Sequence, residues 1–151
     1  MSGKFPHFQM YIDGEFTEGS DGQVMETINP ATGEAWATFS CASKDDVARA
    51  VSAARRALTE GPWSEMTPSQ RGQVLYKLSE LVSEVAHNLG ALETNDSGKL
   101  AKETRMQSGY VSDYYRYYAG LADKIQGATL PIDKPGIFAY TTPEPIGVVA
   151  A

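Results

Sequence analysis

Few residues of this chain have the types and spacing that catalysis or metal binding needs. It contains one cysteine, Cys41, and two histidines, His7 and His87. The histidines lie far apart, and neither has a second His or Cys at the spacing of metal ligands. Cys41 follows a predicted strand and precedes a predicted helix start, where a thiol can become reactive, but no base partner accompanies it. We therefore interpret Cys41 as a small buried residue and both histidines as ordinary surface or partly buried side chains.

The common cofactor and nucleophile motifs are missing as well. The sequence has no GxGxxG, no P-loop and no GxSxG. By default we interpret as surface charges the carboxylates that fall on or near predicted helices, Glu93, Asp96, Glu103 and Asp113. Taken by themselves, the residues predict no catalytic machinery.

Tyrosines form the one unusual cluster, with five of them between positions 110 and 118. They cannot all face one side of a helix. Tyr114, Tyr115 and Tyr118 fit a core face, Tyr110 lies one turn before Tyr114, and Tyr117 points elsewhere. Two interpretations stay open: simple packing with the hydroxyls reaching partners, or the wall of an apolar ligand channel. Periodicity alone favours packing.

Composition limits the kind of protein and its partners. The chain has 151 residues, 42% of them hydrophobic, and a net charge of −6, which suits one core-forming domain or slightly more. The negative charge argues against nucleic acid and anionic membranes as partners. With one cysteine, no apolar run long enough to cross a bilayer and no visible secretory signal, we predict a cytoplasmic location and no membrane partner.

The first forty residues predict strands joined by turns. Residues 8–12 and 15–16 flank Asp13-Gly14, a dipeptide that suits the positive φ angles of a type I′ hairpin turn. Asn29-Pro30 opens a further turn that Gly33 closes. A short strand follows over residues 36–39.

Three helices are expected next. The first begins with Ser43 as N-cap and Asp46 at N3, and the second begins with Thr67-Pro68-Ser69-Gln70. We expect Gly90 to break or bend the second helix. The third is expected over residues 101–125, with Gly127 after its end. The predicted apolar stripes consist of Val47, Val51, Ala54 and Leu58, then Val74, Leu78, Leu81, Val85 and Leu89, and in the third helix Val111, Tyr114, Tyr115, Tyr118, Leu121, Ala122 and Ile125.

The composition and the hydrophobic pattern of the sequence change after Gly127. Four prolines interrupt the remaining residues, which have no helical period. We expect strands over residues 137–142 and 146–151, and proline confines such strands to sheet edges or segment starts.

The order of the segments says more than any one of them. The chain runs through YIDGEF, INPATGE, SKDDVARAVSAARRAL and PWSEMTPSQRGQVLYKLSELV, then LETNDSGK, RYYAGLADK, GATLPID and EPIGVVAA. From about Met10 to Ala151, this order resembles the N-terminal part of an NAD(P)-dependent aldehyde dehydrogenase. One departure is Leu100, which follows Gly98-Lys99 where the family often has a proline.

The resemblance implies an α/β fold in three parts. Residues 1–126 would form the N-terminal β-hairpins and three helices of the cofactor-binding domain. Residues 127–143 would form an extended β arm that joins subunits into a dimer or tetramer. Residues 144–151 would form the first strand of a Rossmann-like sheet, incomplete here. Because family members are several hundred residues long, we expect this chain to be the front third or less of an enzyme.

The implied reaction oxidises a small-molecule aldehyde to a carboxylic acid with NAD or NADP. In the family, a cysteine thiolate attacks the aldehyde to form a thiohemiacetal, hydride leaves to the cofactor, and a glutamate activates water to hydrolyse the thioester. An asparagine and a backbone N–H hold the oxyanion. In family order these groups and the cofactor loop follow Ala151, so the resemblance places no catalytic or cofactor-binding residue in this chain. We expect the chain alone to be inactive.

Two sets of residues could contribute to a site by the same resemblance. The helix that carries RYYAGLADK lines the substrate tunnel in relatives, which implies tunnel positions for Met106, Tyr110, Asp113 and Tyr114. Many relatives also hold K⁺ or Na⁺ near the INP turn, which implies carbonyl ligands from Thr27 and Ile28 and the acid Asp96. For Asp96, a surface acid at a helix C-terminus is an equal alternative.

Two other interpretations remain open. The chain could be a naturally truncated, non-catalytic binding or assembly module that uses its helices and arm. It could also be an independent helical domain that shares these motifs by chance. A module that folds alone should hide its apolar C-terminal segment and unfold in one cooperative transition.

Overall fold

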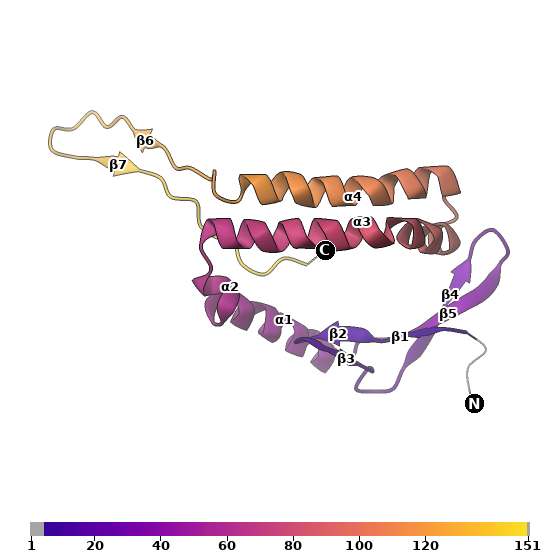
Figure 1. Cartoon of the computed structure of the whole chain (residues 1–151). Coiled ribbons are helices and arrows are strands. Elements are labelled where there is room, and N and C mark those ends of the chain that lie inside the picture. The colour runs from indigo at the N-terminus through magenta and orange to yellow at the C-terminus, as the bar shows by residue number, and fades with distance from the viewer. Residues whose placement is uncertain (1–4, 151) are drawn as a thin grey trace.

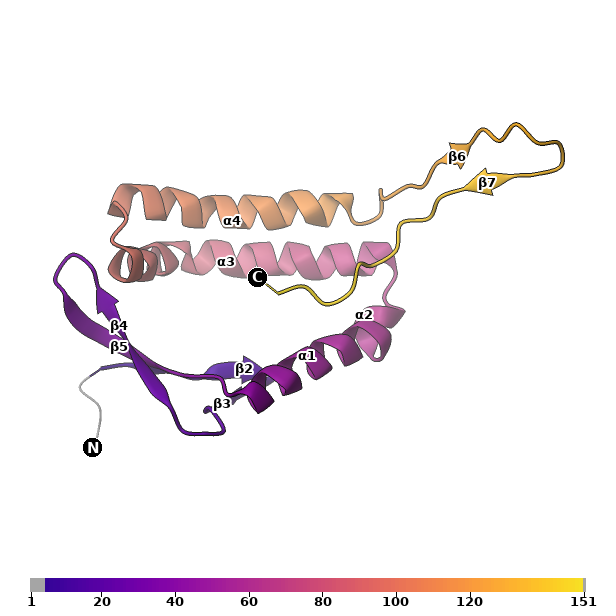
Figure 2. The ribbon, with the colours of Figure 1, turned by 180° about the vertical axis from the view of Figure 1, so that it is seen from behind.

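The computed structural model describes residues 5–150. Figure 1 shows two layers, with the long helices α3 and α4 side by side in one and α1, α2 and the N-terminal strands in the other. A thin arm made of β6 and β7 projects from the end of the helical layer (Figures 1 and 2). This mixed arrangement confirms the predicted α/β class.

The described residues before the first helix form five short strands. β2 (Met10–Ile12) and β3 (Glu15–Thr17) form the predicted antiparallel hairpin. Asp13 and Gly14 have φ angles of 57° and 85°, as a type I′ turn requires. The cross-strand neighbours Tyr11 and Phe16 pack edge to face with ring centroids 5.1 Å apart.

The second sheet has the strand order β1-β5-β4. β1 (His7–Phe8) runs parallel to β5 (Glu34–Ser40), and β4 (Val24–Asn29) is antiparallel to it. Thr27 pairs with Ala37 while Ile28 pairs with Ala35, so Trp36 is an extra residue on β5. Such a bulge interrupts the ladder of backbone hydrogen bonds opposite Thr27 and Ile28.

The first helix begins as predicted. α1 (Lys44–Thr59) is capped by Ser43, and the Asp46 side chain returns the hydrogen bond to the Ser43 backbone. Asp46 is fully buried. Its carboxylate accepts hydrogen bonds from the Ser20 backbone and hydroxyl, at 2.9 and 3.1 Å, and from the Ser43 backbone and hydroxyl, at 2.9 and 2.8 Å. Arg49 adds an ion pair at 2.8 Å, so this carboxylate ties the start of α1 to the segment after β3.

The second long helix runs without the expected break. After the short α2 (Pro62–Glu65), α3 spans Pro68–Ser97 with the predicted capping box of Thr67 and Gln70. Gly90 is buried inside α3. A Cβ atom at Gly90 would lie 3.0 Å from the Cα and N atoms of Arg105, which belong to the next helix. The expected break at Gly90 was wrong, because α3 continues to Ser97 and this glycine permits close helix packing. The alternative of a bend agrees with Figures 1 and 2, in which the last turns of α3 change direction.

The third long helix, α4, spans Ala101–Leu121 and ends four residues before the predicted Ile125. Its face toward α3 carries the small polar residues Thr104, Ser108 and Ser112. The Ser112 hydroxyl donates to the Ser79 carbonyl oxygen of α3 at 2.7 Å. The Thr94 and Thr104 hydroxyls are 2.7 Å apart. Satisfied small polar groups therefore form this helix–helix contact.

The predicted core face of α4 was wrong for most of its residues. Val111, Tyr114 and Tyr118 are exposed, and Tyr115 is half-buried. A core face built from large side chains would hold the two helices apart, whereas Gly72, Ser79 and Gly90 of α3 are buried against the short side chains of α4. Periodicity identified the large apolar and aromatic side, but the small side makes the contact.

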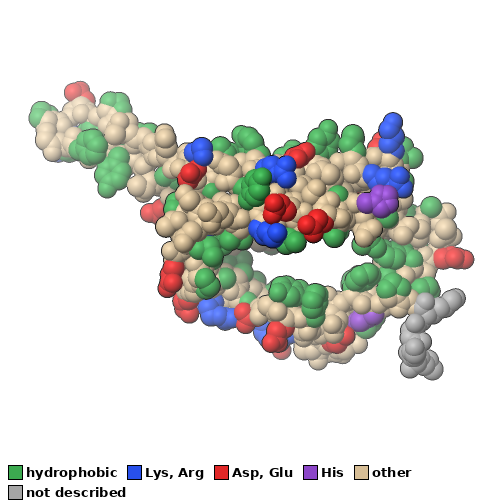
Figure 3. All heavy atoms as spheres, in the orientation of Figure 1, with side chains coloured by type: hydrophobic (Ala, Val, Ile, Leu, Met, Phe, Trp, Pro, Cys, Tyr) green, Lys and Arg blue, Asp and Glu red, His purple; other side chains and the backbone are tan. Residues whose placement is uncertain are grey.

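The apolar stripes of α1 and α3 also remain uncovered. Figure 3 shows hydrophobic side chains along both edges of an opening between the two layers. Within residues 5–150, Ala37 is the only hydrophobic residue whose side chain is buried. The exposed members of these two predicted stripes are Val47, Val51, Ala54, Val74, Leu78, Leu81, Val85 and Leu89.

The C-terminal region is extended. β6 (Thr129–Leu130) and β7 (Ala139–Tyr140) form an antiparallel ribbon, so the predicted strand over 137–142 is confirmed in its centre. Gly127 lies at the base of this ribbon, where a Cβ atom would be 1.8 Å from the Thr141 carbonyl oxygen. It is thus a close-approach position of the arm and not the residue after α4.

The strand expected over residues 146–151 is not formed in the described part, 146–150. A strand of a parallel sheet needs neighbouring strands, and residues 5–150 provide none for this segment. In this same range no helix is both long and apolar enough to cross a membrane.

Candidate functional sites

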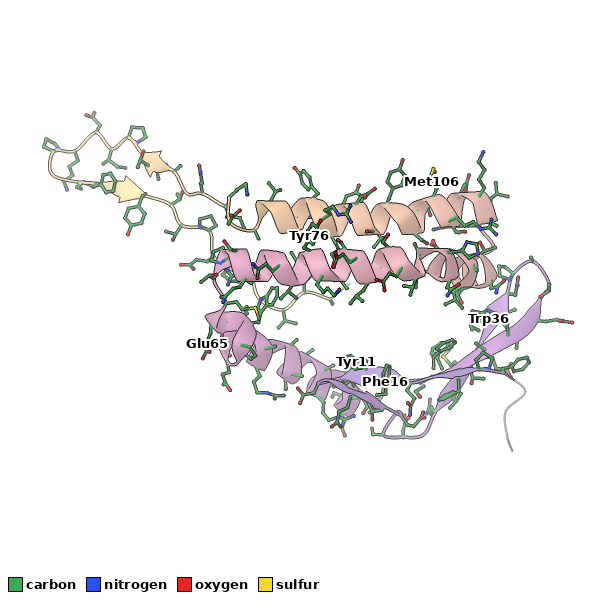
Figure 4. All side chains as sticks on the ribbon, in the orientation of Figure 1. Tyr11, Phe16, Trp36, Glu65, Tyr76 and Met106 are labelled. Carbon is green, nitrogen blue, oxygen red and sulfur yellow. The ribbon has the colours of Figure 1, made fainter. Side chains whose placement is uncertain are left out.

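The tyrosine-rich side of α4 is the first candidate site. Met106, Tyr110 and Tyr114 are 56%, 54% and 65% exposed. With Asp113, these residues follow the spacing of one helix face, which is turned away from the α3 contact. Figure 4 labels Met106 on this outer side of α4.

A shallow cavity of about 360 Å³ lies on that face. Its lining consists of Gln107, Tyr110, Val111 and Tyr114. The structure therefore brings Tyr110 and Tyr114 together at one surface and places Met106 and Asp113 beside them along the helix. The surface is aromatic and can take an apolar or aromatic group, with the tyrosine hydroxyls as polar handles.

The second candidate site lies where β4 meets the end of α3. The Thr27 hydroxyl donates to Asp96 Oδ1 at 2.5 Å, a contact between residues 69 positions apart. The turn that begins at Asn29 lies against the same helix end, because a Cβ atom at Gly98 would come within 2.7 Å of Pro30. Gly98 has a φ angle of 72°, a left-handed conformation that suits glycine at a helix end.

The residues at this junction fit a hard cation. Asp96 lies in the last turn of α3, which contains no basic residue. None of the ion pairs within residues 5–150 involves Asp96. A carboxylate at the negative end of the helix dipole is unfavourable unless positive charge lies nearby. The bulge also interrupts the ladder at Thr27 and Ile28, whose carbonyl oxygens are the ligand type that such cations prefer.

Sequence reasoning missed a polar cluster around Glu18. Its carboxylate accepts hydrogen bonds from His7 Nε2 and Gln9 Nε2, each at 2.9 Å, and from the Ser40 hydroxyl. His7 Nδ1 lies 2.9 Å from the Thr38 hydroxyl. The cluster joins β1 to β5 and to the end of the hairpin. No sequence signal predicts it, because it depends on the parallel pairing of two-residue β1 with β5.

These contacts predict a pH dependence of stability. Hydrogen bonds from Ser40, His7 and Gln9 lower the pKa of Glu18 from 4.5 to about 2. Since the folded pKa is depressed, the stabilisation is complete above the unfolded value and is lost as pH falls from 4.5 toward 2. The bonds from the Ser20 and Ser43 backbones lower the pKa of Asp46 in the same direction.

We expect the thermal midpoint of the protein to fall over this pH range and Glu18→Gln to flatten part of that fall. The measurement is a series of melts between pH 6 and pH 2 for both forms. Parallel curves would contradict a role for Glu18.

The remaining candidates contribute no site. Cys41 is half-buried and His87 is exposed. No group of three or more His, Cys, Asp and Glu side chains in the described part of the chain is arranged to hold a metal ion. Backbone carbonyl oxygens, such as those of Thr27 and Ile28, are a different kind of donor from these side chains.

Comparison with known proteins shows the family of this chain. Residues 16–151 match the model of the aldehyde dehydrogenase family. A (Z)-2-((N-methylformamido)methylene)-5-hydroxybutyrolactone dehydrogenase of Acinetobacter baylyi is 54% identical over 144 residues, covering 95% of this chain and 29% of the relative. Aldehyde dehydrogenase 1 of Tanacetum cinerariifolium is 42% identical, covering 93% of this chain and 28% of the relative.

The fold comparison agrees. An NAD⁺ complex of an aldehyde dehydrogenase from Bacillus cereus superposes with a TM-score of 0.86 at 39% identity, covering 93% of this chain and 28% of that chain. The hairpins, long helices and extended arm are thus those of the N-terminal part of a larger α/β dehydrogenase. The chain belongs to the aldehyde dehydrogenase family, as the segment order predicted. It spans less than a third of the length of these relatives.

Proposed function

We propose that this chain is the N-terminal part of an enzyme that oxidises an aldehyde to a carboxylic acid with NAD⁺ or NADP⁺. The observation that carries the proposal is the family match over residues 16–151, together with 54% identity to a dehydrogenase. The cofactor supplies the hydride acceptor when bound. The chain itself contains no glycine-rich cofactor loop and no cysteine with a base partner, so by itself it is inactive.

The test begins with the intact mass of the protein in its native source. A mass several times the 16.4 kDa of this chain would identify a longer polypeptide. That polypeptide is then assayed for NADH or NADPH formation with an aldehyde panel. A native mass matching this chain, or a longer protein that oxidises no aldehyde, would overturn the proposal and favour the binding-module alternative.

The proposal also assigns a role to each of three segments of the chain. Residues 1–126 are the hairpins and helices of the cofactor-binding domain, and residues 144–151 become the first strand of its sheet once the neighbouring strands are present. Residues 127–143 are an assembly arm. Its exposed apolar side chains support this role, since Phe138 is 75% and Tyr140 is 64% exposed.

The outer face of α4 is proposed to line the substrate tunnel through Met106, Tyr110, Asp113 and Tyr114. The 5-hydroxybutyrolactone in the name of the Acinetobacter relative is the ring-closed form of an aldehyde that also carries a carboxylic acid. We therefore include such hydroxylactones in the panel beside aliphatic and aromatic aldehydes. A monovalent cation, K⁺ or Na⁺, is proposed at Thr27, Ile28 and Asp96.

Tyr110→Ala tests the tunnel in the longer polypeptide. Removing this ring, which lines the cavity with Tyr114, should change kcat/KM unequally across the aldehyde series, by about tenfold for the substrate that contacts it best. The matched control is Tyr76→Ala on α3. Tyr76 is also half-exposed, at 48%, but lies beneath Arg116 and away from this face. An unchanged substrate profile for Tyr110→Ala would remove it from the tunnel.

A further inference from the structure

We propose that the Thr27 side chain is a positioning residue for the cation site: its hydroxyl holds the Asp96 carboxylate against β4, opposite the bulge on β5. This role is separate from the carbonyl that Thr27 contributes as a ligand. The inference rests on the cation site proposed above. It assigns the orientation of the Asp96 carboxylate in that site to the Thr27 hydroxyl group.

The first support is the geometry of the contact. The donor is on β4 and the acceptor is in the last turn of α3, yet the oxygen atoms are 2.5 Å apart. Hydrogen bonds to a carboxylate are short and stronger than neutral ones. Asp96 Oδ1 accepts this bond, which leaves Oδ2 free to bind a cation.

The second support is electrostatic. Asp96 has no ion pair within residues 5–150, and its neighbour Glu93 is already paired with Lys99 at 2.5 Å. Without a fixed partner, an exposed aspartate at the negative helix end would turn toward water. The Thr27 hydroxyl opposes that rotation and keeps the carboxylate beside the interrupted ladder at Thr27 and Ile28.

The third support is that the backbone around Thr27 is held by other contacts. Pro30 lies against Gly98 at the tip of the same turn, and the Asn29 carbonyl accepts from Gly33 at 2.8 Å. Removing the Thr27 hydroxyl should therefore leave the strand and its carbonyls in place. Only the Asp96 side chain is released, so a positioning role can be separated from a loss of fold.

The test uses Thr27→Val in the complete polypeptide, because valine keeps the branched shape and the carbonyl but has no hydroxyl. Thr27→Ser restores the hydroxyl. Thr17→Val is the matched control, since Thr17 is another half-buried strand threonine and donates only to the Glu18 backbone at 3.1 Å. Thermal midpoints are measured against KCl and NaCl concentration, with choline chloride keeping the ionic strength constant.

The thermal midpoints of the unchanged protein and of Thr17→Val should both rise as the cation concentration rises. Half of each rise should occur at the same cation concentration. Thr27→Val should need about tenfold more cation, the loss expected for one hydrogen bond to a charged group, and Thr27→Ser should recover most of it. If the midpoint of Thr27→Val lies below that of the unchanged protein by the same amount at every cation concentration, Thr27 is merely structural and the inference is overturned. If the thermal midpoint of the unchanged protein does not depend on K⁺ or Na⁺, both the cation site and this inference are overturned. The proposed dehydrogenase activity is tested separately by the aldehyde assay.

Discussion

The 151-residue chain, produced by itself, is expected to show no aldehyde oxidation and no single cooperative unfolding transition. The physical reason is its uncovered apolar surface. Ala37 is the one buried hydrophobic side chain within residues 5–150, whereas residues such as Leu81, Val85 and Ile146 are 48%, 44% and 93% exposed. Burial of apolar area is the main source of folding free energy, so most of that stabilisation is missing while these side chains stay exposed.

Three measurements check this expectation. The chain should bind the dye ANS, and its urea unfolding followed by far-ultraviolet circular dichroism should not coincide with the transition followed by tyrosine and tryptophan signals. The complete polypeptide is the control and should bind little dye. Coincident, steep transitions in a monomeric 151-residue chain would contradict the prediction and support the alternative of an independent module.

Gly90→Ala is expected to lower the stability of the complete protein by about 1–3 kcal/mol, the usual cost of forcing an extra methyl group into a tight contact. The new Cβ atom would meet the backbone of Arg105 at 3.0 Å and of Thr104 at 3.1 Å. Backbone atoms cannot swing aside as a flexible side chain can. The helices α3 and α4 must therefore move apart by a few tenths of an ångström at this point, which strains the neighbouring Thr94–Thr104 hydrogen bond.

Gly109→Ala provides the matched control. Gly109 is also a glycine inside a long helix, but a Cβ atom there would meet nothing within 4 Å. Because alanine favours the helical state over glycine by about 0.5–1 kcal/mol, this variant should be neutral or slightly more stable. Denaturant midpoints compare the two variants. Equal effects at both positions would show that helix propensity, and not the close contact of α3 with α4, decides the outcome.

Local features of the fold were predictable from the sequence because neighbouring residues satisfy them. The Asp13-Gly14 turn needs only two residues with positive φ. The capping boxes at Ser43 and Thr67 each close within four residues. The order of such segments was also enough to identify the family, because each element needs its own local signal and eight signals in sequence rarely recur by chance.

The faces that pack were not predictable in the same way. Periodicity marks large apolar side chains, and on α4 it selected Val111, Tyr114 and Tyr118, which are exposed. The real contact uses glycine, serine and threonine, whose small size lets two backbones approach. Gly90 was expected to break or bend α3, because a glycine within a helix weakens it locally. Its role in packing could not be read from the sequence, because the contact that it permits is made by another helix.

The sequence by itself determined the β2–β3 hairpin, the capped starts of α1 and α3 and the family of this protein. Tertiary structure alone decided that Thr27 meets Asp96 across 69 residues, that Glu18 collects donors both from residues 7–9 and from β5, and that the large apolar stripes stay open. The physical reason is the range of the interactions. Turns and caps are closed by neighbours in the chain, whereas a side chain's burial depends on which distant surface arrives to cover it.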